Sequence, residues 1–232
     1  MEDQFKIFTL SHFVLLGLIP LIAAGLTWWS RRDTRRIRVI RMILGIVLMV
    51  NELVWYWYYV RQDWFVFPYS LPLQLCDILV WIAVAVMLFP RQRTYELLYY
   101  WGLSGTLMAV LTPDLSTPLF SYVSIRFFAA HGGIIIAVLF LTWRKVLRPE
   151  TGSHWRALLY LHIYAILIGV FNLVFDTNFF YLCCKPSEPS LLDHMGPWPV
   201  YILVGDLLAV LLFWLLWLPF RKKRFAITHG DG

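Results

Sequence analysis

The stretch Leu71–Trp81, with the sequence LPLQLCDILVW, places a thiol and a carboxylate inside an otherwise apolar run. Cys76 and Asp77 are unfavourable in hydrocarbon, where an aspartate at the centre of a membrane helix costs roughly 2.5–3.5 kcal/mol on insertion scales. The fold must therefore supply polar partners or water at this position. A buried thiol beside an ionisable group can also act as a nucleophile, so this stretch bears on chemistry as well as on fold.

The composition around this stretch is that of a membrane protein. The chain has 232 residues, of which 60% are hydrophobic and 15% charged, and its mean hydropathy is +0.67. Soluble domains average about 45–50% apolar and about 25% charged residues. The sequence therefore predicts an all-α, polytopic membrane helix bundle, with residues 1–232 forming a single integral membrane domain and no cleavable signal peptide.

The apolar blocks have the length of membrane-spanning helices. Each is about 20 residues long, which matches a hydrocarbon core of about 30 Å. We predict about seven spans, at residues 10–29, 39–60, 70–89, 94–111, 120–143, 157–175 and 198–219.

The basic residues predict the orientation of these spans. Most Lys and Arg residues follow the first, third, fifth and seventh spans, and the exceptions are Lys6, Arg61, Arg126 and Lys185. The positive-inside rule then places the N-terminus outside and the C-terminus in the cytoplasm. Because these charges flank spans instead of forming one patch, they favour contact with anionic lipid headgroups over nucleic-acid binding.

With this orientation, polar residues on most spans fall at a similar depth in the outer half of the membrane. A single buried polar residue is often only a hydrogen bond between helices. Their joint occurrence predicts a water-accessible cavity that opens to the extracytoplasmic side. His162 alone falls in the inner half. The residues at the shared depth are Asn51, Glu52, Gln74, Cys76, Asp77, Asp114, Arg126, His131, Asn172, Asp176 and Asp206.

Within the third span, the thiol and the carboxylate face different directions. Gln74 and Asp77 share a helix face, whereas Cys76 points about 100° away from Asp77. A base for the thiol must therefore come from another helix, and His131 is the histidine at matching depth. A Cys–His pair activates sulfur because the imidazole accepts the thiol proton. The alternative is that His131 only makes a hydrogen bond between helices.

Other kinds of chemistry have no signal in the sequence. We find no metal-ligand cluster, phosphate loop or nucleotide fingerprint, and we expect neither a cofactor nor a metal. Cys183 and Cys184 are adjacent in a predicted outer loop, where a mutual disulfide would be strained, and they receive no role.

Several short motifs occur in a fixed order along the chain. Residues about 10–220 resemble the YwaF-like bacterial integral membrane proteins, relatives of the eukaryotic transmembrane protein 164 family. The motifs that carry the resemblance are LPLQLC (71–76), LTPDL (111–115), RFF (126–128), HG (131–132), TNFF (177–180), KP (185–186) and GPWP (196–199).

The resemblance implies a lipid-directed acyltransferase with an essential cysteine and histidine, which correspond to Cys76 and His131. Its implied partners are membrane lipids, namely phospholipid and lysophospholipid substrates, and its implied location is a bacterial plasma membrane. In this hypothesis His131 accepts the proton of Cys76, and the thiolate attacks a lipid ester. The acyl group then passes from sulfur to a lysolipid or to water.

The remaining polar residues receive supporting roles in this hypothesis. Gln74, Asn172 or Asn178 would donate a hydrogen bond to the oxyanion. Arg126 would hold a lipid phosphate or form an ion pair with Asp114. The residues that would shape or orient the site are Asp77, Glu52 and Asp206.

Two other classes of protein remain open at this stage. One is a proton- or cation-coupled transporter or channel that uses Glu52, Asp77 and Asp206 as its ion sites. The other is a structural or partner-binding membrane protein whose polar residues only hold helices together.

Overall fold

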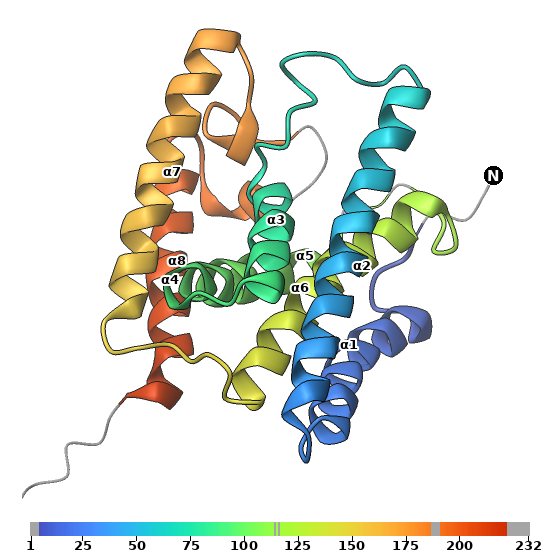
Figure 1. The fold of residues 1–232 in the computed structure, drawn as a ribbon. Coiled ribbons are helices and arrows are strands. Elements are labelled where there is room, and N and C mark those ends of the chain that lie inside the picture. The colour runs from blue at the N-terminus through green and yellow to red at the C-terminus, as the bar shows by residue number, and fades with distance from the viewer. Residues whose placement is uncertain (1–4, 114, 116, 187–190, 222–232) are drawn as a thin grey trace, which may run out of the picture.

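The computed structural model describes residues 5–113, 115, 117–186 and 191–221. Over these residues the protein is a bundle of helices without β-strands (Figure 1). Among the described residues, 4 helices are long and apolar enough to cross a membrane. These helices are α1 (Leu10–Trp29), α6 (Tyr122–Trp143), α7 (Ser153–Phe175) and α8 (Val200–Trp217), the last of which continues into the 3₁₀ turn η4 (Leu218–Phe220).

The helices that match their predicted spans have identifiable ends. Helix α1 has the predicted bounds. Helix α2 (Thr34–Arg61) begins before the predicted residue 39, because the Asp33 side chain accepts a hydrogen bond from the Arg35 N–H and caps the helix. Helix α7 likewise begins before residue 157, directly after Gly152, which has a φ of 76°.

The third span differs from its prediction. The sequence predicts a helix over 70–89, but α3 extends only over Leu75–Leu88, and residues 62–74 form turns and bends. Pro68 and Pro72 explain the late start, since the residue before a proline is disfavoured in the helical region. Cys76 and Asp77 therefore lie in the first turn of α3, and not one and a half turns inside a longer helix.

The fourth span is helical but irregular. The predicted span 94–111 comprises α4 (Gln92–Leu97), the π-helix η1 (Leu98–Thr106) and α5 (Leu107–Leu111). Serine and threonine side chains bind carbonyls of the widened turns: Ser104 donates to Tyr100 O, and Thr106 donates to Gly102 O. π-Helical segments are rare, and most are single turns inside α-helices, frequently at functional sites.

The core lies where η1 packs against α3 and α6, and η1 is enclosed between α6 on one side and α7 and α8 on the other (Figure 1). Ala83, Met87, Tyr100, Ile134 and Phe140 are fully buried there. By contrast, α1, α7 and α8 expose long rows of apolar side chains, which is typical of surfaces that face lipid.

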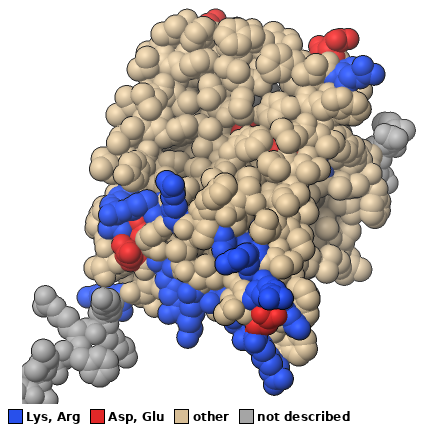
Figure 2. Space-filling view, viewed as in Figure 1, with Lys and Arg blue, Asp and Glu red and all other residues tan. Residues whose placement is uncertain are grey.

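Basic side chains gather at one end of the bundle, which we call the basic end (Figure 2). The connections from α1 to α2 and from α6 to α7 both lie there (Figure 1). This is the distribution that the positive-inside rule requires of a cytoplasmic end.

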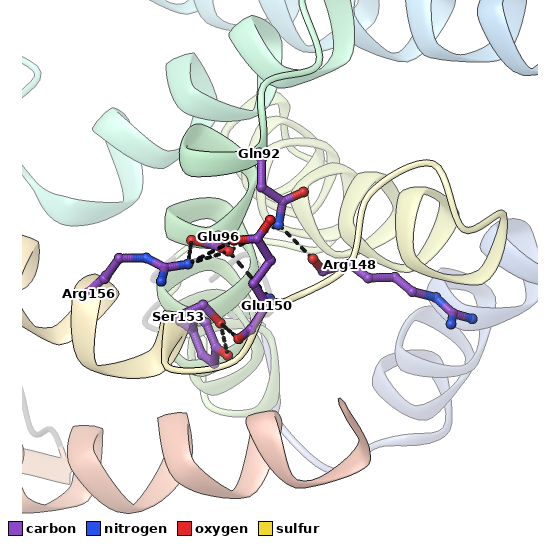
Figure 3. Close-up of polar contacts among 7 residues, drawn as sticks. Gln92, Glu96, Arg148, Glu150, Ser153 and Arg156 are labelled. Carbon is purple, nitrogen blue, oxygen red and sulfur yellow. Dashed lines mark hydrogen bonds and ion pairs between the residues drawn. The ribbon is translucent and has the colours of Figure 1, made fainter. Parts of the chain in front are cut away.

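A polar network at the basic end holds α4 to the start of α7 (Figure 3). Buried Glu96 accepts hydrogen bonds from Arg156 Nη2 at 2.9 and 2.8 Å, and from Gln92 Nε2 at 3.0 Å. Arg156 also reaches exposed Glu150, at 3.3 Å, and Ser153 Oγ donates to the Glu150 carbonyl at 2.7 Å. Gln92 further donates to the Arg148 carbonyl, so the α6–α7 connection is fixed against α4.

We expect Glu96→Ala to lower the free energy of unfolding by about 2–4 kcal/mol, because it leaves Arg156 and Gln92 without their shared acceptor. The matched control is Glu150→Ala, which removes an exposed ion pair and costs less than about 1 kcal/mol. Thermal unfolding of both variants in detergent measures the difference. Equal destabilisation by the two substitutions would contradict the role given to Glu96.

Candidate functional site

The start of α3 is held in place by α7 and by the segment that follows α7. The carbonyl of Leu73 accepts a hydrogen bond from the Tyr164 hydroxyl at 2.7 Å. The side chain of Gln74, the N-cap residue, accepts one from the Phe180 N–H at 2.9 Å. Non-helical backbone at membrane depth needs such partners within the protein, and these two bonds provide them.

Cys76 and Asp77 occupy the first turn of α3, where backbone N–H groups lack the usual partner four residues earlier and the Asp77 N–H donates instead to the Gln74 carbonyl at 3.1 Å. The Cys76 sulfur lies near the N–H groups of Cys76 and Asp77, and the Asp77 carboxylate lies near the N–H of Gln74. Because the positive end of the helix dipole favours negative charge, this location compensates in part for the cost of placing these groups in a membrane.

A buried ion pair joins α2 to α6 beside this turn. Arg126 Nη2 donates to both carboxylate oxygens of Glu52, at 3.0 and 2.9 Å, and its guanidinium lies over the Trp55 ring at 4.6 Å. Glu52 is fully buried, so the pair neutralises a charge that is otherwise costly. Arg126 is also within electrostatic range of Cys76, Asp77 and His131.

His131 lies on α6 with a defined proton position. Its Nδ1 is 2.9 Å from the Phe127 carbonyl oxygen, which can only accept, so Nδ1 carries the proton. In the neutral ring Nε2 is then the basic nitrogen, and no described residue forms a hydrogen bond with it. The Phe127 ring stacks on the imidazole, with centroids 4.1 Å apart, and His131 is buried.

Two tyrosines complete the site, and sequence reasoning did not find them. Tyr56 and Tyr164 both lie within electrostatic range of Cys76 and Asp77. Aromatic residues near the outer ends of the spans resembled an interfacial belt. The position of Tyr56 one turn after Glu52 was the available signal. We call the resulting group, from four helices, the central cluster: Glu52, Tyr56, Cys76, Asp77, Arg126, His131 and Tyr164.

The three amides predicted to bind an oxyanion have different surroundings. Asn172 is saturated: its Oδ1 accepts from Thr177 and Phe179, and its Nδ2 donates to the Phe179 carbonyl. Asn178 is engaged in the same way with the backbone of Cys184 and the N–H of Cys183. Gln74 uses only its oxygen in bonds with described residues. Its Nε2 group therefore remains available to a ligand.

Among the described residues, the predicted site residue Asp206 lies apart from the central cluster. Asp114 lies outside the described residues, and Arg126 has Glu52 as its ion-pair partner. Asp206 lies on α8, where its Oδ1 is 3.0 Å from Nε2 of His162 on α7. The sequence placed His162 in the inner half of the membrane and Asp206 in the outer half. In the structure, α7 extends well past the start of α8 at the end of the bundle away from the basic end, and the two side chains meet (Figure 1).

The apolar helices and the polar centre between them define an all-helical membrane protein. The family model described as the TMEM164 family matches residues 7–217, and the chain belongs to this family. No curated protein and no solved structure matches the chain.

We expect Glu52→Gln and Arg126→Gln each to destabilise the protein by about 3–5 kcal/mol, because each leaves the partner charge buried and unpaired. The double variant removes both charges, so we expect it to be less destabilised than the sum of the single variants. Thermal unfolding of the three variants in detergent measures this coupling. Additive effects would show that the pair does not neutralise a buried charge.

Proposed function

We propose that this protein is a membrane-embedded lipid acyltransferase in which Cys76 is the nucleophile and His131 the general base. The observation that carries the proposal is the central cluster, in which a free thiol lies at a helix N-terminus within range of Arg126. The fixed tautomer of His131 leaves a basic nitrogen, as the base of a nucleophile–base pair requires. The resemblance carried by the LPLQLC and HG motifs implies the same two residues.

The proposed reaction has two halves. His131 Nε2 takes the proton of Cys76, and the thiolate adds to the ester carbon of a phospholipid. The ester C–O bond then breaks, the acyl group remains on sulfur as a thioester, and His131 returns the proton to the leaving lysolipid oxygen. In the second half, the hydroxyl of an acceptor lysophospholipid attacks the thioester by the same steps in reverse.

The surrounding residues stabilise charge in this reaction. Gln74 Nε2 is the proposed donor to the oxyanion, since the amides of Asn172 and Asn178 are already engaged. Arg126 acts as the positive charge near the thiolate. Because its Nη2 is bound by Glu52, this role replaces the direct phosphate contact predicted from the sequence.

We also propose an orientation of the protein in its membrane and the membrane in which it acts. Helix α3 begins inside the bundle, after a connection that comes from the end away from the basic end, and it runs toward the basic end (Figure 1). With the basic end in the cytoplasm, Cys76 would act in the extracytoplasmic half of the membrane. We propose the plasma membrane of a bacterium as the site of action, on the resemblance to bacterial membrane proteins.

The transporter alternative has less support from the geometry. It uses Glu52, Asp77 and Asp206 as ion sites, but Glu52 is bound by Arg126 and Asp206 by His162. At Glu52, both carboxylate oxygens are bound, so a cation would have to displace Arg126 in order to bind. We therefore favour the enzyme.

Cys76→Ala is expected to lower acyl transfer by at least ~10³-fold, since the nucleophile is lost. The assay uses purified protein in nanodiscs with labelled phospholipid and unlabelled lysophospholipid, and measures label in the product lipid. Cys183→Ala and Cys184→Ala are matched controls that remove exposed thiols and leave transfer unchanged. Unchanged transfer in Cys76→Ala would exclude the mechanism. Ion flux across liposomes that contain the Cys76→Ala protein would favour the transporter.

Gln74→Glu tests the oxyanion donor separately from the fold. Glutamate keeps the oxygen that accepts from Phe180 N–H but removes the donor and adds a carboxylate at membrane depth, so we expect kcat to fall by about 10²–10³-fold, with any loss of stability measured separately. Transfer kinetics together with thermal unfolding check both parts. A normal kcat in this variant would remove Gln74 from the reaction.

A further inference from the structure

A second site lies apart from the central cluster, in a cavity of about 470 Å³ between α7, α8 and the π-helix η1. Its walls are almost entirely apolar, with the backbone and side chains of Phe180–Leu182 at one end and Leu75 at the wall nearest Cys76. The volume lies within the range of small-molecule sites, about 300–1,000 Å³. Such a space can hold one hydrocarbon chain.

The polar group of this cavity is the pair formed by His162 and Asp206, which both line it. His162 Nδ1 lies 2.9 Å from the Leu158 carbonyl oxygen, and a carbonyl can only accept, so Nδ1 carries a proton. The other nitrogen, Nε2, lies 3.0 Å from Asp206 Oδ1. A neutral Nε2 and a carboxylate would be two acceptors in contact, so one further proton must lie between them.

The pair therefore carries one proton and no net charge, either as imidazolium and carboxylate or as imidazole and carboxylic acid. Neutrality is what a membrane interior favours. No described residue donates a hydrogen bond to the second oxygen of Asp206. That oxygen is available to a ligand in the cavity.

The other walls of the cavity provide no further charge. The titratable side chains that line it besides the pair are Tyr181 and Tyr201, and the Tyr201 hydroxyl donates to the Tyr181 carbonyl. The walls from α3, η1 and α5 contribute Leu75, Trp101, Ser104, Gly105 and Met108. Among the residues that line the cavity, an anionic head, whether carboxylate or phosphate, would thus find only an imidazole that Asp206 already engages. Lys185, which lies over the Tyr201 ring, is paired with Asp193.

We propose that this cavity binds a single-chain lipophilic amine, whose nitrogen takes the proton of the His162–Asp206 pair and forms an ion pair with Asp206. The amine enters from the lipid in its neutral form. The proton moves from the pair to the amine nitrogen, and the ammonium group then donates to both the Asp206 carboxylate and Nε2 of neutral His162, so that these two acceptors are again joined through a donor. The total charge is zero before and after the transfer, so no charge has to be brought into the membrane.

The test compares three photoreactive probes with the same diazirine-bearing chain and different heads: a primary amine, an alcohol and a carboxylic acid. Purified protein in phosphatidylcholine nanodiscs is irradiated with each probe, and labelled peptides of α7 and α8 are quantified by mass spectrometry. The amine is expected to label these peptides about tenfold or more above the other two. Equal labelling by all three heads would overturn the proposal without any variant.

Substitutions locate the amine within the cavity. Asp206→Asn is expected to reduce amine labelling to the level of the alcohol, whereas the matched control Asp176→Asn, at the exposed end of α7, leaves it unchanged. Ala209→Phe, which fills the cavity, is expected to remove labelling of α7 and α8 by all three probes. Full amine labelling in folded Asp206→Asn would overturn the proposal. Cys76→Ala is expected to bind the amine normally, so this site is tested independently of acyl transfer.

Discussion

The arrangement of this protein depends on how the interrupted third span satisfies its backbone. A helix of 14 residues, α3, is too short to cross the hydrocarbon core, and the chain before it is not helical. Polar backbone at that depth is tolerated only when protein groups bind it. Tyr164 and Phe180 do so, and this requirement brings α7 and its following segment against the start of α3.

Opposite charges on different helices fix the rest of the bundle. Glu52 binds Arg126 between α2 and α6, and Glu96 binds Arg156 between α4 and α7. Lipid gives helices little hydrophobic reason to associate, so close packing and polar pairs decide which faces meet. A glycine of α6 also decides which faces meet, because a Cβ atom at Gly133 would lie 2.7 Å from a side-chain carbon of Leu48 on α2. The absence of a side chain at Gly133 therefore allows α2 and α6 to approach closely.

The central cluster and the cavity differ in the chemistry they offer. In the central cluster a thiol and an imidazole each lie within electrostatic range of the Arg126 cation, which suits the binding of negative charge. The cavity instead joins an apolar chain-sized space to a neutral pair with one free carboxyl oxygen, which suits a donor or a cation. Helix α7 contributes to both, with Tyr164 on the side of α3 and His162 on the side of α8.

The sequence by itself determined the class of fold and the two residues on which the proposed chemistry rests. Hydropathy depends only on the residues of one segment, so the bounds of α1 and α6 could be predicted accurately. The LPLQLC and HG motifs singled out Cys76 and His131. The late start of α3 was missed although Pro68 and Pro72 signal it locally, whereas the π-helix lies where η1 packs against α3 and α6, which are distant in the chain.

The tertiary structure alone decided which polar groups meet. Arg126 pairs with Glu52, and Asp206 pairs with His162. Tyr56 and Tyr164 both lie within electrostatic range of the Cys76 thiol. Such pairings depend on the rotation of each helix and its shift along the membrane normal. Those two quantities are set by packing between helices, and the sequence of a single helix does not contain them.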